Sequence, residues 1–253
     1  MSIALLASAR SLEPLDRRSA RLGGWVGVTG WLRCALCAIG MALLAGPTWA
    51  GGVHADVPAS PDARVKYLLY MNGLGLETAG PRAQAYQYRD ILDALAGRGF
   101  EVIGEQRASV RADAYAEKVA GQVKALLGAG VPASHITVAG HSKGGMITML
   151  VMAMVRNPEV AYVNFAGCGQ PGSGFEGFQR FGQARGPMAQ GILLSAYDRD
   201  DRIAGSCKAA LDRMTKAKVT ERVLDVGGGH EAFYTPKASW LDVLQGWAER
   251  RGP

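Results

Sequence analysis

The feature that most constrains the fold is a short glycine-rich motif, Gly140-His141-Ser142-Lys143-Gly144-Gly145. A short apolar, β-branched run, residues 136–139, precedes it, and a helix-like run, residues 146–156, follows it. The motif therefore predicts a tight turn between a strand and a helix. In so sharp a turn Ser142 must adopt strained backbone dihedrals, and the flanking glycines let strand and helix approach without clashes. Such a turn leaves the Ser142 hydroxyl exposed above the edge of a sheet.

The rest of the chain alternates between strand and helix patterns. Short runs rich in β-branched and aromatic residues predict strands, and longer runs with apolar residues at helical spacing predict helices. The predicted strands are 65–70, 100–104, 135–139, 162–166, 192–197 and 222–226, and the predicted helices are 84–98, 112–127, 146–156, 205–216 and 238–250. This order predicts one α/β domain over residues 65–253, with a mainly parallel sheet of about six strands and helices on both faces.

The loops that follow strands are where functional groups gather in a parallel sheet, because the carboxyl ends of the strands share one edge. The serine turn and the loops 198–202 and 227–230 all follow predicted strands. A serine at this edge becomes a nucleophile only if a neighbouring base removes its proton. Histidine is the side chain that most often acts as such a base.

Four histidines are candidates for that base. His54 lies in a stretch that reads as a flexible linker, His135 precedes its strand at the opposite edge, and His141 adjoins the serine but points elsewhere. His230 follows a strand and three glycines, which predict a flexible turn able to present its ring. His230 is thus the predicted base, and a solvent-facing loop histidine is the alternative.

The base needs a carboxylate to orient it and to stabilise its charged form. Asp198, Asp200 and Asp201 all follow the strand predicted to end at Tyr197. The spacing favours Asp201, which is followed by one residue and then an apolar and a small residue. Asp200 and Asp198 remain alternative acids.

The order Ser142, Asp201, His230, with a Gly-x-Ser-x-Gly turn in a βα alternation, resembles the α/β-hydrolase superfamily. The resemblance covers about residues 65–250. It implies a compact form of that fold, lacking its first two strands, and serine hydrolase activity on a carboxylic ester through an acyl-enzyme. It implies no cofactor and no metal. A non-catalytic binding protein of the same fold is the alternative from another functional class.

The resemblance also implies an oxyanion hole made by the backbone N–H groups of Lys143 and Leu74. The family commonly has His-Gly in the loop that holds the second donor, where this chain has Asn72-Gly73. A simple turn is the alternative interpretation of that pair. The Lys143 side chain is predicted to be a surface charge, because a residue adjacent to the serine is badly placed to act as its base.

The substrate is predicted less sharply than the chemistry. The stretch 167–190, where this superfamily usually inserts a cap, is short and rich in glycine. Little or no cap is therefore expected, which favours small or modest-sized soluble esters. Amide, thioester and lactone cleavage remain open.

The first fifty residues have the pattern of an export signal, with five arginines, two acidic residues and an apolar segment at 34–46. Small residues precede a cleavage site after Ala50. A retained membrane anchor is the alternative, but the apolar run of about 13 residues is shorter than the roughly 20 that a span needs. We expect a cleaved signal at 1–50, a linker at 51–64, a periplasmic or secreted protein, and no stable membrane span after cleavage.

The formal net charge of the whole chain is +6, and about half of it lies in the leader. The remaining positive charge is scattered without a Lys/Arg block, so nucleic acid is not an expected partner. Of the four cysteines, only Cys168 and Cys207 follow the leader. In an oxidising compartment such a pair often forms a disulfide, and two separate buried thiols are the alternative.

Overall fold

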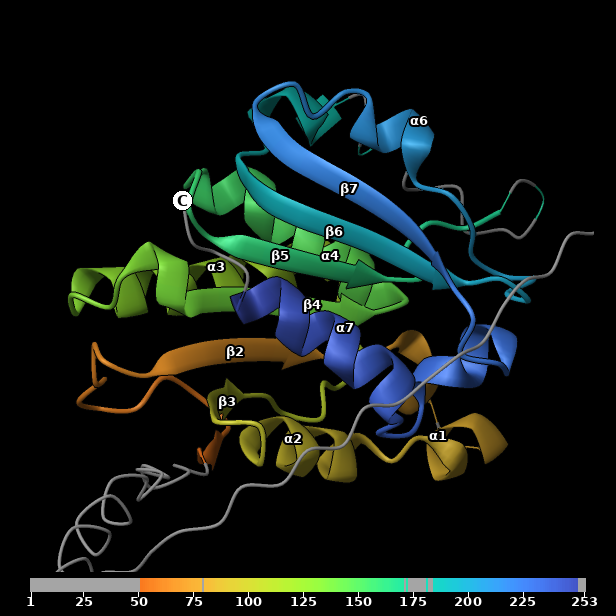
Figure 1. The fold of residues 1–253 in the computed structure, drawn as a ribbon, viewed down its shortest axis with the longest axis horizontal. Coiled ribbons are helices and arrows are strands. Elements are labelled where there is room, and N and C mark those ends of the chain that lie inside the picture. Colours follow the sequence, from red (N-terminus) through yellow and green to blue (C-terminus); the bar gives the residue numbers. More distant parts are fainter. Residues whose placement is uncertain (1–50, 79, 171, 173–180, 182–183, 250–253) are drawn as a thin grey trace, which may run out of the picture. The chain divides into compact units, whose positions relative to one another are not determined.

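The computed structural model describes residues 51–78, 80–170, 172, 181 and 184–249. The predicted signal peptide lies outside these residues, and so does part of the stretch 167–190 on which the expectation of a small cap rests. The described chain builds one sheet with helices packed against it (Figure 1).

The sheet has seven strands, all parallel, in the order β1-β3-β2-β4-β5-β6-β7. The strands are β1 (Val53–His54), β2 (Lys66–Met71), β3 (Phe100–Ile103), β4 (Ile136–His141), β5 (Ala161–Phe165), β6 (Gly191–Asp198) and β7 (Ala217–Leu224). The predicted α/β class with a mainly parallel sheet is confirmed. All six predicted strands are present, and the seventh is β1.

Strand β1 comes from the segment predicted to be a linker. Its two residues pair with β3, and the N–H of Val102 donates to the carbonyl of Gly52 at 2.9 Å. Part of the segment is therefore built into the edge of the sheet instead of forming a free linker. A strand of two residues has no alternation of apolar side chains, so periodicity could not predict it.

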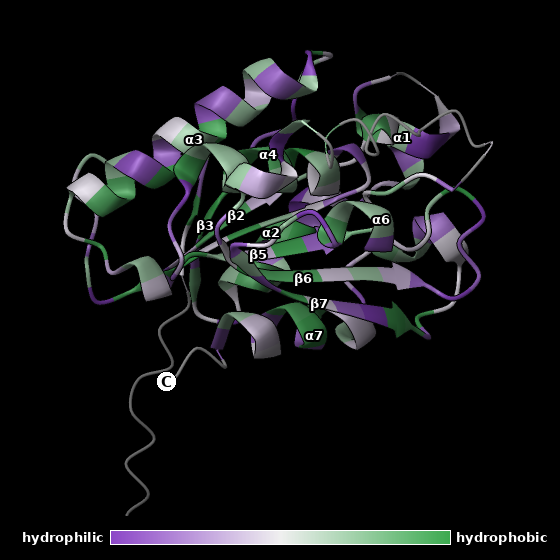
Figure 2. Cartoon of the chain, turned by 90° about the horizontal axis from the view of Figure 1, so that it is seen from above, coloured by the Kyte–Doolittle hydropathy of each residue, from purple (hydrophilic) through white to green (hydrophobic). Residues whose placement is uncertain are grey.

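The helices cover both faces of the sheet, as predicted. They are α1 (Pro81–Ala85), α2 (Tyr88–Ala96), α3 (Ala112–Gly128), α4 (Lys143–Val155), α6 (Lys208–Leu211) and α7 (Ala238–Glu249). Short 3-10 turns are η1 (Leu74–Leu76), η2 (Ala133–His135), η3 (Gly186–Met188) and η4 (Gly229–Phe233). One apolar core lies between the sheet and α3, α4 and α6, and a second lies between the sheet and α2 and α7. Figure 2 shows α3 and α4 on one side of the sheet and α7 on the other.

Two element boundaries differ from the sequence predictions. The predicted helix 84–98 is two helices, because the backbone at Tyr86 is extended and its side chain is buried. The predicted helix 205–216 shortens to α6, and β7 begins at Ala217 instead of residue 222. Strand β7 is at the edge of the sheet and carries polar residues along its length, such as Lys218 and Glu221, so it lacks the apolar signal of a buried strand.

Candidate active site

The turn between β4 and α4 has the strained geometry that its sequence predicts. Ser142 lies between the two elements with φ 55° and ψ −117°, a region that residues other than glycine rarely occupy. A Cβ atom at Gly140 would lie 2.5 Å from the carbonyl carbon of Gly144, and one at Gly144 would lie 2.3 Å from the carbonyl oxygen of Met71. Gly140 is therefore required for β4 and α4 to pack this closely, and Gly144 is required for α4 to approach the end of β2.

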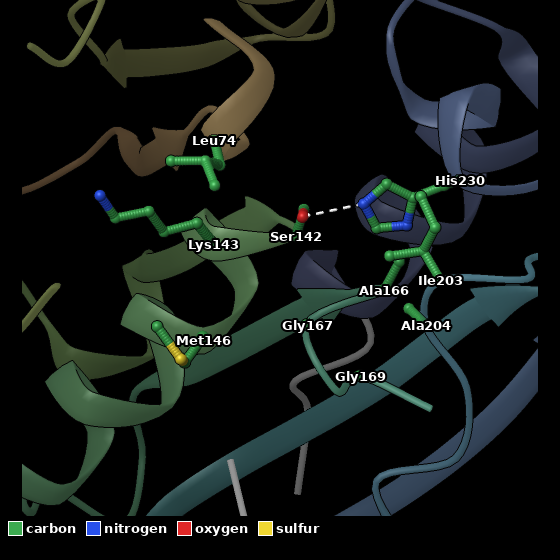
Figure 3. A pocket seen from close by; sticks show the side chains of 10 residues that line it. All are labelled: Leu74, Ser142, Lys143, Met146, Ala166, Gly167, Gly169, Ile203, Ala204 and His230. Atoms are coloured by element: carbon green, nitrogen blue, oxygen red, sulfur yellow. Dashed lines mark hydrogen bonds between the residues drawn. The ribbon is translucent and has the colours of Figure 1, made fainter. Parts of the chain in front are cut away.

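The structure brings the predicted serine, histidine and Asp201 together in one hydrogen-bonded chain. His230 Nε2 lies 2.8 Å from Ser142 Oγ, and His230 Nδ1 lies 2.8 Å from Asp201 Oδ2 (Figure 3 shows the first bond). An ionised carboxylate only accepts, so Nδ1 carries the proton and donates it to Asp201. Nε2 then accepts the hydrogen bond from the Ser142 hydroxyl, which is the arrangement that a general base requires.

The Asp201 carboxylate is buried and its orientation is fixed by the backbone. Its Oδ1 accepts the N–H groups of Ile203 and Ala204, each at 2.8 Å, which leaves Oδ2 facing His230. The side chain of Asp201 has no exposed area, and that of His230 is 11% exposed. The pair is thus largely shielded from water, which strengthens its electrostatic interaction.

The two alternative acids lie elsewhere. Asp198 is buried at the end of β6 and accepts four backbone N–H groups, those of Asp200, Val226, Gly227 and Gly229. It therefore fixes the loop that carries His230, a role that the sequence analysis did not predict. Asp200 is exposed.

The backbone of two further predicted residues flanks the serine. Lys143 is the first residue of α4, and the first N–H groups of a helix have no acceptor within the helix. Leu74 begins η1, directly after β2 and the buried Asn72. Leu74, Lys143 and Ser142 line the same pocket (Figure 3). In Figure 3 both residues lie on the side of Ser142 opposite His230.

The prediction that the Lys143 side chain is a surface charge is wrong. The side chain is 16% exposed, and its Nζ donates to Glu77 Oε2 at 2.6 Å and to the Val110 carbonyl at 2.6 Å. Figure 3 shows it extending away from Ser142, so it is not placed to act as the base. The loop after β2 brings the buried Glu77 carboxylate to it, and nothing in the local sequence predicts that contact.

The other histidines do not bond the serine. His141 is buried, its Nδ1 lies 3.2 Å from Tyr86 Oη, and its ring centroid lies 4.8 Å from that of His230. Burial, and then the neighbouring His230, hold the pKa of His141 well below its usual 6.5. His141 therefore stays neutral beside His230. His135 bonds the carbonyl of Ala63 from η2, and His54 pairs with Glu101 on the outer strands.

The pocket beside Ser142 has a volume of about 270 Å³. Apart from Ser142, Lys143 and His230, its lining is made of apolar and small residues: Leu74, Met146, Ala166, Gly167, Gly169, Ile203 and Ala204. Such a lining suits a small uncharged group.

The structure joins Cys168 and Cys207 in a disulfide. The bond lies beside the pocket and ties the loop after β5 to the loop that carries Asp201. Gly205 N–H donates to the Cys168 carbonyl at 2.9 Å, and the Gln170 side chain donates to the Asp201 carbonyl at 2.6 Å. The disulfide is thus part of the support for the acid loop.

Clusters of metal-binding side chains and helices able to span a membrane are both absent from the described part of the chain. Over those residues, no group of three or more His, Cys, Asp or Glu side chains could hold a metal ion. No helix formed by them is long and apolar enough to cross a membrane.

Comparison with known proteins gives a fold and no family by sequence. No protein-family model and no curated protein matches the chain. The structure is similar to the bifunctional GH43-CE protein of Bacteroides eggerthii, with a TM-score of 0.50 and 15% identity, over 77% of this chain and 32% of that one. That likeness concerns the fold and agrees with the all-parallel sheet of this chain. The strained serine turn after β4, and the acid and the histidine after β6 and β7, are observed in this chain itself.

The chain has the α/β-hydrolase fold. Other similar structures are SOBER1 of Arabidopsis thaliana, with 13% identity and a TM-score of 0.49 over 74% of this chain and 98% of that one, and an esterase/lipase from an uncultured bacterium, with 14% identity and a TM-score of 0.47 over 76% of each chain. At such identities an α/β-hydrolase fold alone does not define a reaction, which must be argued from the site.

Proposed function

We propose that the protein is a serine hydrolase that cleaves carboxylic esters through an acyl-enzyme, with Ser142, His230 and Asp201 as its catalytic triad. The observation that supports this most is the position of His230, which bonds both Ser142 Oγ and Asp201 Oδ2 at 2.8 Å. The base and its orienting carboxylate thus stand in the order and at the distances that nucleophilic catalysis by serine requires.

The proposed reaction has two steps. His230 Nε2 takes the proton of Ser142 as Oγ attacks the acyl carbon, and Asp201 stabilises the imidazolium that forms. His230 then gives the proton to the leaving alcohol as its C–O bond breaks. In the second step His230 removes a proton from water, the hydroxide attacks the acyl carbon, and the acid leaves as Ser142 recovers its proton.

The negative charge on the carbonyl oxygen in both steps needs preorganised donors. The backbone N–H groups of Lys143 and Leu74 are the proposed pair, because both residues border the pocket beside Ser142. Removing one such donor costs about 10²- to 10³-fold in turnover in other serine hydrolases.

The pocket supports a substrate class. Its volume of about 270 Å³ and its apolar lining favour a short, uncharged acyl or alcohol group over a long chain or a charged one. The disulfide between Cys168 and Cys207 favours an oxidising compartment, so we keep the periplasm or the exterior as the proposed location.

The test is hydrolysis of p-nitrophenyl esters of increasing acyl length by purified protein, beside Ser142→Ala. We expect hydrolysis of the short esters and its loss in the variant. Labelling by a fluorophosphonate probe, run in parallel, separates the alternatives. Labelling without ester hydrolysis would redirect the proposal to an amide, thioester or lactone bond. Folded protein that neither labels nor hydrolyses would refute a serine hydrolase and favour a binding role.

A further inference from the structure

Three charged side chains form a buried cluster next to the proposed oxyanion hole. The side chains of Glu77 and Arg107 are 0% and 1% exposed, and that of Lys143 is 16% exposed. Arg107 Nε donates to Glu77 Oε1 at 2.6 Å, and Lys143 Nζ donates to Glu77 Oε2 at 2.6 Å. Both oxygens of the carboxylate are thus occupied, each by a different cation.

The cluster joins three segments that are distant in the sequence. Glu77 ends the turn η1 that contains Leu74, Arg107 lies in the loop between β3 and α3, and Lys143 opens α4. The two proposed donors of the oxyanion hole therefore stand on the two segments that Glu77 connects. Leu74 lies three residues before Glu77, and its carbonyl accepts the Glu77 N–H at 2.9 Å. The second donor is the backbone of Lys143 itself.

Arg107 also holds the other end of the Leu74 loop. Its Nη2 donates to the carbonyl of Asn72 at 2.7 Å, and its backbone N–H donates to Asn72 Oδ1 at 3.3 Å. The Asn72 side chain in turn donates to the carbonyl of Gly73 at 2.9 Å. The loop between Asn72 and Glu77 is therefore fixed at both ends by one guanidinium.

A buried ion cluster is a costly way to hold a loop, because taking charges out of water can cost more than their attraction returns. Apolar residues of similar size would stabilise a core as well. What charged groups add is a fixed direction, since each bond is short and the carboxylate has only two oxygens to share. Direction is what an oxyanion hole requires, because its donors must point at the position where charge develops.

We propose that Glu77 is a positioning residue that aligns the Leu74 and Lys143 backbone donors through its bonds to Lys143 and Arg107. This inference rests on the proposed function, since it concerns the same reaction. Glu77 does not touch the substrate. It acts by holding the two sides of the oxyanion hole at one distance from each other.

Two variants test the inference at different risk to folding. Glu77→Gln keeps the size of the side chain and removes its charge, which leaves two buried cations without a carboxylate. Lys143→Met removes the more exposed cation and leaves Glu77 and Arg107 as a neutral pair, so it is the variant expected to fold as wild type does. Lys143→Arg restores the cation. The matched control is Lys118→Met, which breaks a lysine–carboxylate pair with Glu105 that is 40% and 33% exposed.

The readouts are kcat per active site, titrated with a fluorophosphonate, KM, and the inhibition constant of an alkyl boronic acid, which forms a tetrahedral adduct on Ser142. We expect Glu77→Gln and Lys143→Met to lower kcat about 10- to 100-fold and to weaken boronate binding by a similar factor, with KM within about threefold of wild type. Lys143→Arg should recover most of the loss, and Lys118→Met should match wild type.

A merely structural role gives a different result. It would lower the melting temperature and the fraction of titratable sites, while kcat per titrated site and boronate affinity stayed at wild-type values. That result in Lys143→Met would overturn the inference with the proposed function intact. A wild-type protein that neither hydrolyses esters nor reacts with the fluorophosphonate would instead remove the proposed function and this inference with it.

Discussion

The substitution Asp201→Asn tests the proposed triad without changing its shape. In the native site Oδ1 of Asp201 accepts two backbone N–H groups, from Ile203 and Ala204, and Oδ2 accepts the proton of His230 Nδ1. Asparagine has one oxygen and one NH₂ group. Because the two backbone donors require an acceptor, the amide oxygen takes the place of Oδ1 and the NH₂ group faces His230.

That orientation reverses the tautomer of His230. Facing a donor, Nδ1 must become the acceptor, so the proton moves to Nε2. Nε2 then donates to Ser142 and can no longer take its proton. In a comparable serine protease the same change lowers kcat about 10⁴-fold, which corresponds to about 5 kcal/mol in activation free energy. We expect a similar loss here, because the two backbone bonds enforce the wrong orientation.

The assay is kcat on the best ester of the panel, with protein unfolding followed in parallel. Asp201→Asn should unfold near the wild-type temperature, since its backbone bonds survive. Asp200→Asn is the matched control, because that side chain is one residue away and exposed, and it should keep wild-type kcat. The reasoning is refuted if Asp201→Asn retains kcat within tenfold of wild type, or if Asp200→Asn loses as much.

Three further predictions concern folding. Gly144→Ala should prevent stable folding or cost several kcal/mol, because its Cβ would lie 2.3 Å from the Met71 carbonyl oxygen; near-wild-type urea unfolding would contradict this. Replacing Cys168 and Cys207 by serine should destabilise by about 4 kcal/mol, from the 39-residue separation that the disulfide closes, and an unchanged unfolding midpoint would contradict it. The lowered pKa of His141 means that the unfolded chain binds a proton below pH 6.5 that the folded chain does not, so stability falls by up to about 1.4 kcal/mol per pH unit below that value. His141→Gln should reduce this slope between pH 6.5 and 5, and equal slopes in urea unfolding would exclude the effect.

The parts of the fold that could be predicted are those encoded locally. The sharp turn around Ser142 is encoded in part by the close approach of Gly140 and Gly144, and the strands β2 to β6 carry dense apolar signals. The spacing after Asp201 also has a local cause, because its Oδ1 accepts the N–H groups two and three residues ahead. That turn requires a backbone N–H at the second and third positions after the acid, which proline would lack. Ile203 and Ala204 both supply one.

The parts that could not be predicted depend on distant partners. Strand β1 forms by pairing with β3, which lies about 50 positions later in the sequence. The burial of the Lys143 side chain depends on the Glu77 carboxylate, 66 residues earlier. Neither contact leaves a periodic or compositional trace. The same holds for the Glu77–Arg107 pair, whose residues are 30 positions apart. A single sequence contains these residues but not the register that brings them together.

The three glycines before His230 are held by hydrogen bonds that the local sequence does not reveal. They predict a flexible turn, and their φ angles of 73°, 109° and 60° do require glycine-like freedom. Yet the N–H groups of Gly227 and Gly229 bond the buried Asp198 carboxylate, at 2.9 Å and 3.1 Å. Because Asp198 ends β6, three residues before Asp201, one carboxylate anchors both the acid loop and the histidine loop to the same strand. The glycines therefore supply an unusual backbone path, and Asp198 holds that path in place, so that the His230 ring meets Ser142 and Asp201 with little reorganisation.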